Sequence, residues 1–152
     1  MKNCMEVLLV DDHAGDVRWM IEFLEERGYR VHEITNEEAA RRQLEAVKKG
    51  DASYALAIID IMVAIKDIMD LLGSKEEFYE KSRDTGIRLC HYARKELGIS
   101  AERLPIVCLS ARDDDKVRQL LDELEIALYS RTPQTSEDSI REYLRNELSS
   151  VE

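Results

Sequence analysis

Short apolar runs alternate with amphipathic stretches along most of the chain. The runs at residues 5–10, 54–59 and 105–109 lack the polar alternation of a half-exposed strand. They therefore predict strands that are covered on both faces, as in a parallel sheet. Two further runs, at 29–34 and 126–129, complete a set of five. The run at 29–34 is the more polar and is expected nearer an edge of the sheet.

Between these runs, apolar residues recur at the spacing of one helix face. The first helix is marked by Val17, Met20, Ile21 and Leu24 and ends at Gly28, and the second runs from a capping box, Thr35 to Glu38, to Lys49 and ends at Gly50. The third spans 86–97 before Gly98, and the fourth is marked by Val117, Leu120, Leu121 and Leu124. The fifth is capped by Ser136 and turns Ile140, Tyr143, Leu144 and Leu148 inward. Glycine after a helix and a polar cap before it are the usual end signals. The alternation predicts one α/β domain of (βα)5 type, a three-layer, doubly wound fold with a parallel sheet between two helix layers.

Chemistry is expected at the carboxyl ends of the strands, where ligands bind in open α/β sheets. Asp11 and Asp12 follow the first strand, Asp60 the third and Ser110 the fourth. Three carboxylates in one place repel one another, and a hard cation such as Mg²⁺ offsets that repulsion. A carboxylate can also attack phosphorus to give an acyl phosphate. The pattern thus favours a magnesium and phosphate site.

Composition narrows the range of partners. The 152 residues suit one domain, and 32 acidic against 22 basic residues give a net charge of −10, which argues against binding nucleic acid. No apolar run is long enough for a membrane span or a signal peptide, so we expect a cytoplasmic protein. The cysteines, Cys4, Cys90 and Cys108, have no paired spacing and are expected to be free and mostly buried.

Three strand ends resemble the signature motifs of two-component response-regulator receiver domains. They are Val-Leu-Leu-Val-Asp11-Asp12, Leu-Ala-Ile-Ile-Asp60 and Ile-Val-Cys-Leu-Ser110-Ala111, with Glu-Arg-Gly28-Tyr-Arg-Val before the second strand. The similarity covers nearly the whole chain, which we expect to be a stand-alone receiver over residues 1–152. It implies a flavodoxin-like fold with strand order 2-1-3-4-5.

The resemblance also implies a role for each matching residue. Asp60 would be the phosphoacceptor. Asp12 would bind Mg²⁺ directly, Asp11 would bind it through water, and Met62 would offer its backbone carbonyl to the metal. Ser110 would contact the phosphoryl group beside the small Ala111, and Tyr129 would be the aromatic residue that changes rotamer on activation. The phosphoryl donor would be a sensor histidine kinase or a phosphotransfer protein. The protein would then be a phosphoacceptor that can dephosphorylate itself rather than an enzyme, and it would act on a downstream protein or as a homodimer, without nucleic acid or membrane.

One departure from the family concerns the Lys that receivers carry before a Pro at the end of the fifth strand. Anchored on Pro133, that position is Thr132, 22 positions after Ser110 as in ordinary receivers. Arg131 replaces the missing cation only if a bulge turns it round, because strand side chains alternate faces.

A second departure is the length of chain between Asp60 and Gly86, 26 positions, with Ala64 where the family has Pro. We expect a helical insertion at about 63–84, with an apolar face that includes Ile65 and Leu72. It would be a lid over Asp60, a docking helix, or a helix packed against its neighbour.

Two other functions compete with the working phosphoacceptor. A pseudo-receiver would keep the fold and bind proteins with little or no phosphorylation, as Thr132 suggests. A phosphohydrolase of the haloacid-dehalogenase kind would need a second Asp two residues after the nucleophile, where this chain has Met62.

Overall fold

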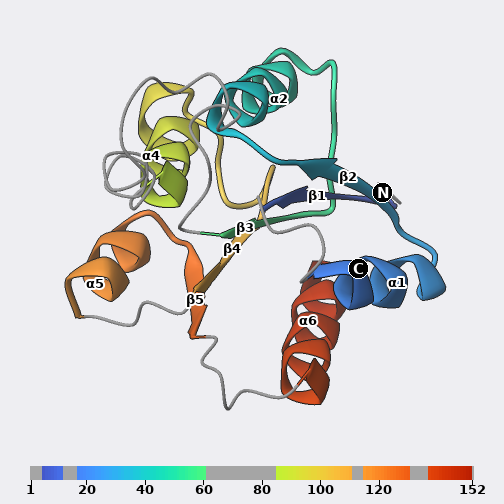
Figure 1. Cartoon of the computed structure of the whole chain (residues 1–152). Helices are drawn as coiled ribbons and strands as arrows, with labels where there is room; N and C mark the ends of the chain where they lie inside the picture. Colours follow the sequence, from blue (N-terminus) through green and yellow to red (C-terminus); the bar gives the residue numbers. More distant parts are fainter. Residues whose placement is uncertain (1–4, 12–16, 61–84, 111–114, 131–136, 152) are drawn as a thin grey trace, which may run out of the picture.

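The computed structural model describes residues 5–11, 17–60, 85–110, 115–130 and 137–151. Five parallel strands form one sheet in the order β2-β1-β3-β4-β5. The strands are β1 (Glu6–Val10), β2 (Arg30–Ile34), β3 (Leu56–Asp60), β4 (Ile106–Ser110) and β5 (Ala127–Ser130). Both the parallel sheet and its strand order agree with the fold class predicted from the sequence (Figure 1).

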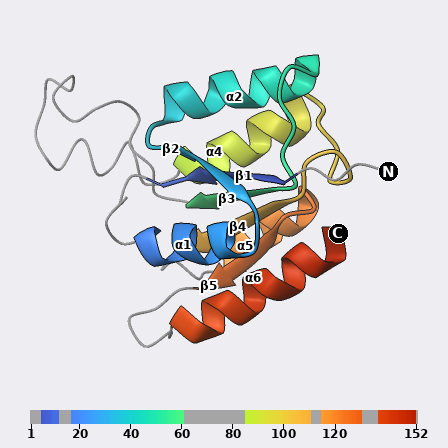
Figure 2. The same cartoon turned by 90° about the vertical axis from the view of Figure 1, so that its right-hand side faces the viewer.

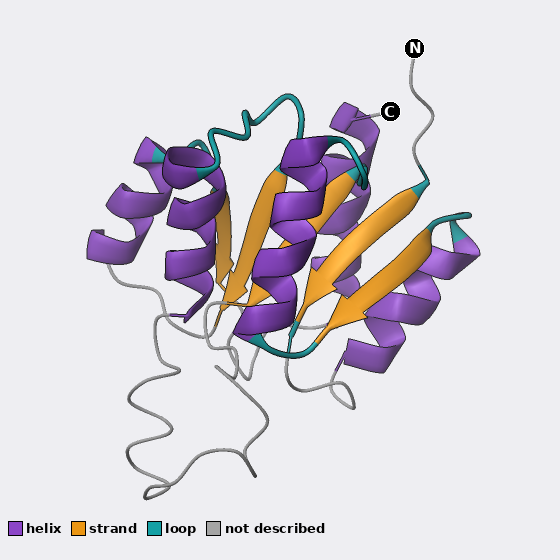
Figure 3. Cartoon of the chain, turned by 90° about the horizontal axis from the view of Figure 1, so that it is seen from above, coloured by secondary structure: helices purple, strands orange, loops and turns teal. Residues whose placement is uncertain are grey.

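Helices cover both faces of this sheet. They are α1 (Arg18–Glu26), α2 (Glu37–Lys49), α4 (Thr85–His91), α5 (Asp115–Glu123) and α6 (Glu137–Val151), and α4 continues as the π-helical turn η3 (Tyr92–Glu96). Figure 2 shows α2 and α4 on one side of the sheet and α1 and α6 on the other. Viewed from above, the strands form a single layer among the helices (Figure 3). The three layers predicted from the sequence are therefore present.

Strand side chains divide the core into two clusters. Leu8 and Val10 pack with α2, α4 and α5, whereas Val7 and Leu9 pack with α1 and α6. This is the alternation that a strand imposes when both of its faces are covered. We call the two sides the α1/α6 face and the α2/α4/α5 face. The edge strand β2 is more exposed than the central β3, whose five residues are all buried, as the sequence predicted.

Helix ends follow the sequence signals, with one correction. Gly50 ends α2 in the left-handed conformation, with φ of 88°, which a residue with a side chain rarely adopts. The prediction that Thr35 caps this helix is wrong, because the Asn36 side chain accepts a hydrogen bond from the Ala39 backbone N–H. A side-chain oxygen one residue later reaches the same turn, since Asn caps as well as Thr does.

The faces of the helices also agree with their apolar spacing, except at one position. Ile140, Leu144 and Leu148 of α6 are buried. Leu120 of α5 is 36% exposed, although its spacing placed it on the inward face. The other three residues predicted on that face, Val117, Leu121 and Leu124, are buried.

Candidate functional site

Two of the predicted acids meet at the carboxyl end of the sheet. Asp11 directly follows β1, and Asp60 is the last residue of β3. These strands are neighbours, with Val10 opposite Ile59, so Asp11 and Asp60 occupy the next level of the same register. Adjacent strands lie about 4.8 Å apart, which brings the two backbone positions close together.

The direction of both acids follows from strand alternation. Leu9 and Ile58, two residues before Asp11 and Asp60, pack on the α1/α6 face. Because strand side chains alternate between faces, Asp11 and Asp60 point toward the same side of the sheet edge as Leu9 and Ile58. Both side chains are buried, with residue exposures of 3% and 8%. The Asp11 backbone N–H also donates to the Ile34 carbonyl, at 3.0 Å, which extends the ladder from β1 to β2 and fixes this end of the strand.

The fourth and fifth strands end at the same level. Asp60 lies opposite Leu109, and Leu109 lies opposite Tyr129, while Ser110 and Ser130 form the next pair. The backbone of Ser110 therefore comes one step beyond the level of Asp60, at the same edge. The sequence prediction that these strand ends converge is consistent with this register.

Tyr129 has a partner that the sequence did not identify. Its half-buried ring stacks on Tyr143 of α6, with ring centroids 4.4 Å apart and planes inclined by 29°. Burial raises the pKa of the Tyr143 hydroxyl, and the nearby Glu147 carboxylate raises it further. Helical spacing had placed Tyr143 inward, but no pattern in one sequence pairs it with a residue on a strand.

Several predicted site residues fall outside the described part of the chain. They are Asp12, Met62, Ala111, Arg131 and Thr132, together with the insertion at 63–84. Their positions stay predictions. Within the described residues no group of three or more His, Cys, Asp or Glu side chains is placed to hold a metal, and two of the four predicted ligands are not among them.

The donors that are described suit a hard divalent cation. Asp11 and Asp60 are two buried carboxylates on adjacent strands. Carboxylate oxygen is a ligand that Mg²⁺ prefers, and Mg²⁺ commonly takes only one or two carboxylates and completes its shell with water or phosphate oxygens. The residues present therefore fit a magnesium ion.

A cavity of about 770 Å³ lies at the opposite end of the sheet. It is lined by residues that precede β3 and β4, among them Ala55 and Pro105, and by the end of α2 at Gly50. Arg103 closes one side by donating to the carbonyls of Val47 and Lys48. The cavity is separated from the acidic end by the length of the strands and does not belong to the same site.

Comparison with known proteins adds sequence and structural relatives. No protein-family model matches the chain. The transcriptional regulatory protein HprR of Escherichia coli (strain K12) is 29% identical over 118 residues, which are 76% of this chain and 40% of that protein. This chain thus matches less than half the length of that regulator.

Solved structures share the fold at lower identity. A CheY-like response regulator receiver domain protein from Methanospirillum hungatei JF-1 has a TM-score of 0.66 at 15% identity, covering 98% of this chain and 97% of that chain. A two-component response regulator from Clostridium difficile has a TM-score of 0.65 at 16% identity, covering 95% and 96%. The signal receiver domain of a histidine kinase from Syntrophus aciditrophicus has a TM-score of 0.62 at 19% identity, covering 97% and 92%.

Among the described helices, none is both long and apolar enough to cross a lipid bilayer. The sheet order, the acidic strand ends and the relatives agree with one another. The resemblance inferred from the sequence is thereby confirmed: the chain is similar in sequence to a transcriptional regulatory protein and has the fold of CheY-like receiver domains.

Proposed function

We propose that this domain accepts a phosphoryl group from a sensor histidine kinase, or from a phosphotransfer protein, onto Asp60. The observation that carries the proposal is the pairing of Asp60 with Asp11. Asp11 and Asp60 are buried and lie at the carboxyl ends of the adjacent strands β1 and β3, at the same level of the sheet. Their side chains point toward the same side of the sheet edge. Two adjacent carboxylates offer the oxygen ligands that Mg²⁺ takes in proteins, and a carboxylate can serve as the nucleophile toward phosphorus.

The reaction follows from the chemistry of a carboxylate. An Asp60 oxygen forms a bond to phosphorus, the bond from phosphorus to the donor imidazole nitrogen breaks, and the imidazole takes up a proton. The product is an aspartyl phosphate. Burial of Asp60 to 8% exposure limits the access of water, which slows hydrolysis of that product. Self-dephosphorylation is then the slow return step, and the domain is a phosphoacceptor rather than an enzyme.

Asp11 and Asp60 would hold a Mg²⁺ ion, joined by Asp12 and the Met62 carbonyl as the resemblance implies. When bound, the metal neutralises charge on the transferring group. Asp11 is well suited to this role because the hydrogen bond from its own backbone to Ile34 holds it in place. Ser110 and Tyr129 would respond to the phosphoryl group from the next two strands.

Partners and location remain part of the proposal. Relatives named as response regulators and as a kinase receiver support a histidine kinase as the kind of donor. Output would pass through the surface of α5, β5 and α6, where Leu120 is 36% exposed, to a downstream protein or a second copy of the chain. The acidic charge supports a protein-binding role without nucleic acid, and we propose a cytoplasmic location as expected from the sequence.

A pseudo-receiver is the second candidate. Thr132 stands where the family Lys is expected, so the cation that would contact the phosphoryl group is replaced by a neutral side chain. In that case the domain would bind a protein partner through the same surface and take up phosphate weakly or not at all.

Acetyl phosphate separates the two candidates. The full chain, incubated with acetyl phosphate and Mg²⁺ and weighed intact, is expected to gain the mass of one phosphoryl group. Asp60→Asn should abolish the adduct, whereas Asp51→Asn, the same change at an exposed aspartate after α2, should leave it intact. Chelation of the metal should also prevent it. Absence of an adduct on the wild-type chain would instead establish the pseudo-receiver.

A further inference from the structure

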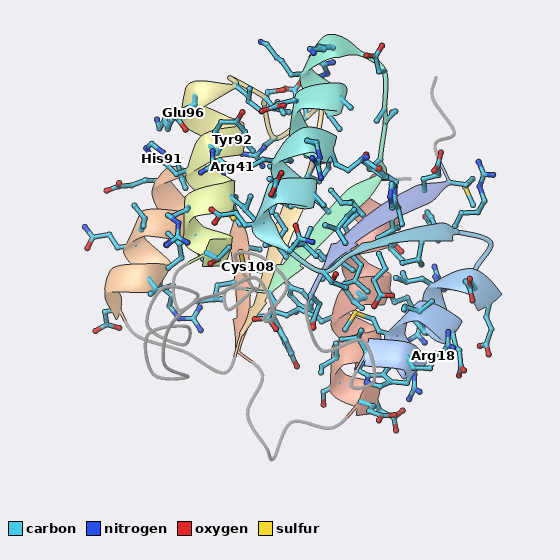
Figure 4. All side chains as sticks on the ribbon, turned by 45° about the horizontal axis from the view of Figure 1, so that its top comes forward. Arg18, Arg41, His91, Tyr92, Glu96 and Cys108 are labelled. Carbon is cyan, nitrogen blue, oxygen red and sulfur yellow. The ribbon has the colours of Figure 1, made fainter. Side chains whose placement is uncertain are left out.

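Two cysteines that are distant in sequence lie side by side in the core. Cys90 belongs to α4 and Cys108 to β4, and their Sγ atoms are 3.5 Å apart. Both residues are fully buried and neither is in a disulfide. Figure 4 shows Cys108 beside the ribbon of α4. The sequence predicted free, buried thiols but gave no reason to pair them.

We propose that Cys90 and Cys108 form a dithiol modification site, which peroxide-class oxidants convert to a disulfide within the domain. The proposal stands on this contact and does not depend on phosphorylation of Asp60. A disulfide needs its sulfurs about 2.05 Å apart, so the pair must close by roughly 1.5 Å. Closing this gap requires α4 to move toward the sheet.

The local structure of α4 provides that freedom. The helix has only seven residues, and directly after Cys90 and His91 its backbone widens into the π-helical turn η3. Such turns interrupt the regular ladder of a helix and often accompany functional positions. Cys108, by contrast, is fixed in the centre of β4, between β3 and β5. The mobile partner is therefore Cys90.

The chemistry balances with one peroxide as the oxidant. A hydrogen bond with Cys90 raises the pKa of Cys108 well above its usual range, and burial adds to this shift, so Cys108 keeps its proton in the resting state. The Cys90 sulfur then attacks one peroxide oxygen, which breaks the O–O bond and releases the other oxygen as water or alcohol. Cys108 displaces hydroxyl from the resulting sulfenic acid, and its proton leaves with that hydroxyl as water.

The cross-link would connect α4 to the strand beside the acidic site. Cys108 lies opposite Ile59, the residue before Asp60. A disulfide here closes a loop through residues 90–108 and reduces the conformational entropy of the unfolded chain. This raises the stability of the fold when the native packing accepts the bond. Oxidation therefore stiffens the side of the sheet that supports the phosphoacceptor.

The test uses the folded full chain and hydrogen peroxide. After oxidation, the protein is denatured, alkylated with iodoacetamide and digested, and the reduced protein is treated in parallel. We expect two of the three cysteines to resist alkylation, a peptide pair linked through Cys90 and Cys108, and reversal by a thiol reductant. Cys4→Ser should oxidise like wild type, whereas Cys90→Ala and Cys108→Ala should not form the link.

Thermal melting provides an independent readout on the wild-type chain. The oxidised protein should melt at a higher temperature than the reduced protein. Full alkylation after peroxide treatment or a disulfide that includes Cys4 would overturn the proposed site, and a lower melting temperature after oxidation would contradict its stabilising effect.

Discussion

The two faces of the sheet are held together in different ways. On the α1/α6 face, guanidinium groups lie over aromatic rings, with Arg141 above Trp19 at 5.1 Å and both Arg27 and Arg145 near Phe23. These contacts add little polar structure to an apolar interface. The α2/α4/α5 face instead carries directed polar bonds between its elements.

Two hydrogen-bonded pairs and one cation–π contact tie α4 and η3 to α2 on the α2/α4/α5 face. Arg88 of α4 contacts both carboxylate oxygens of Glu37 at 3.4 Å. Tyr92 donates to Glu45, and Arg41 lies over the Tyr92 ring at 4.4 Å (Figure 4). All of these contacts join α4 and its continuation η3 to the neighbouring helix α2, so they set the two helices against each other rather than against the sheet.

The acid pair and the polar contacts between α2 and α4 lie on opposite sides of the sheet. Asp11 and Asp60 share the parity of the α1/α6 face, while the polar connections and the cysteine pair lie on the other face. The acid pair therefore lies on the side of the sheet opposite to the Glu37–Arg88 and Glu45–Tyr92 pairs. A mutation in those connections should change stability without removing the acids.

The largest effects should come from the core and should be equal on the two faces. Leu44→Ala in α2 and Leu144→Ala in α6 each remove a fully buried side chain. Each should lower the free energy of unfolding by about 2–5 kcal/mol in urea denaturation. Because the sheet separates them, the double variant should show nearly additive losses. A loss confined to one face would mean that only this face forms a packed core.

Arg94 and Arg141 test separately the buried hydrogen bonds of one face and the exposed ion pairs of the other. Arg94 donates to the carbonyls of Leu124, Ile99 and Leu104, at 2.8 to 3.2 Å. Burial lowers its pKa. Arg94→Met leaves those carbonyls without a donor and should cost about 1–3 kcal/mol of unfolding free energy.

Arg141→Met is the matched control on the other face. Arg141 pairs with Glu137 and Asp138, whose side chains are 57% and 92% exposed. Exposed pairs contribute about 0–1 kcal/mol. Equal losses for the two arginines, measured by the same urea titration, would remove the proposed contrast between the faces.

A smaller effect tests the cap of α2. Asn36→Ala removes the acceptor for the Ala39 N–H and should cost about 1 kcal/mol. Thr35→Ala, one residue earlier, should change the thermal melting temperature little. If Thr35→Ala is the more destabilising of the two, the capping box predicted from the sequence is correct and the observed cap is not.

The smallest effect is a dependence of stability on pH. The pKa of Tyr143 is raised in the folded protein by burial. An unfolded tyrosine loses its proton near pH 10, so the folded state holds that proton to higher pH. This contribution to stability is fully present below about pH 10 and is lost as the pH rises toward and through the folded pKa.

Tyr143→Phe keeps a ring for the stack on Tyr129 and removes the ionisable hydroxyl. The variant should lose less stability than wild type between about pH 8 and about pH 11, measured by urea denaturation. Identical pH profiles for the two proteins would contradict the assigned cause.

The order of the elements could be predicted from the chain because it depends on local pattern. Buried runs ending in Asp11, Asp60 and Ser110 fixed the strands, and helical spacing fixed what lies between them. The convergence of these ends then followed from the geometry of parallel sheets. The family resemblance supplied the roles of Asp12, Met62, Ala111 and Thr132, which the described residues do not test.

Contacts between elements could not be predicted in the same way. The approach of Cys90 to Cys108, the stack of Tyr129 on Tyr143 and the pair of Glu37 with Arg88 each depend on the lateral placement of a helix. One sequence shows which face a helix buries but not how far it slides along the sheet. The prediction of a cap at Thr35 was wrong for a smaller reason, since Thr35 and Asn36 are both good caps and one residue decides between them.

The most direct test of the acidic site locates the phosphoryl group on the chain. The protein is treated with acetyl phosphate and Mg²⁺ and then with borohydride, which reduces an aspartyl phosphate to homoserine, and the modified residue is found by tandem mass spectrometry. We predict homoserine at position 60 alone, and none when Asp11 is changed to Asn. Homoserine at Asp51 or another exposed acid, with position 60 unchanged, would contradict the account.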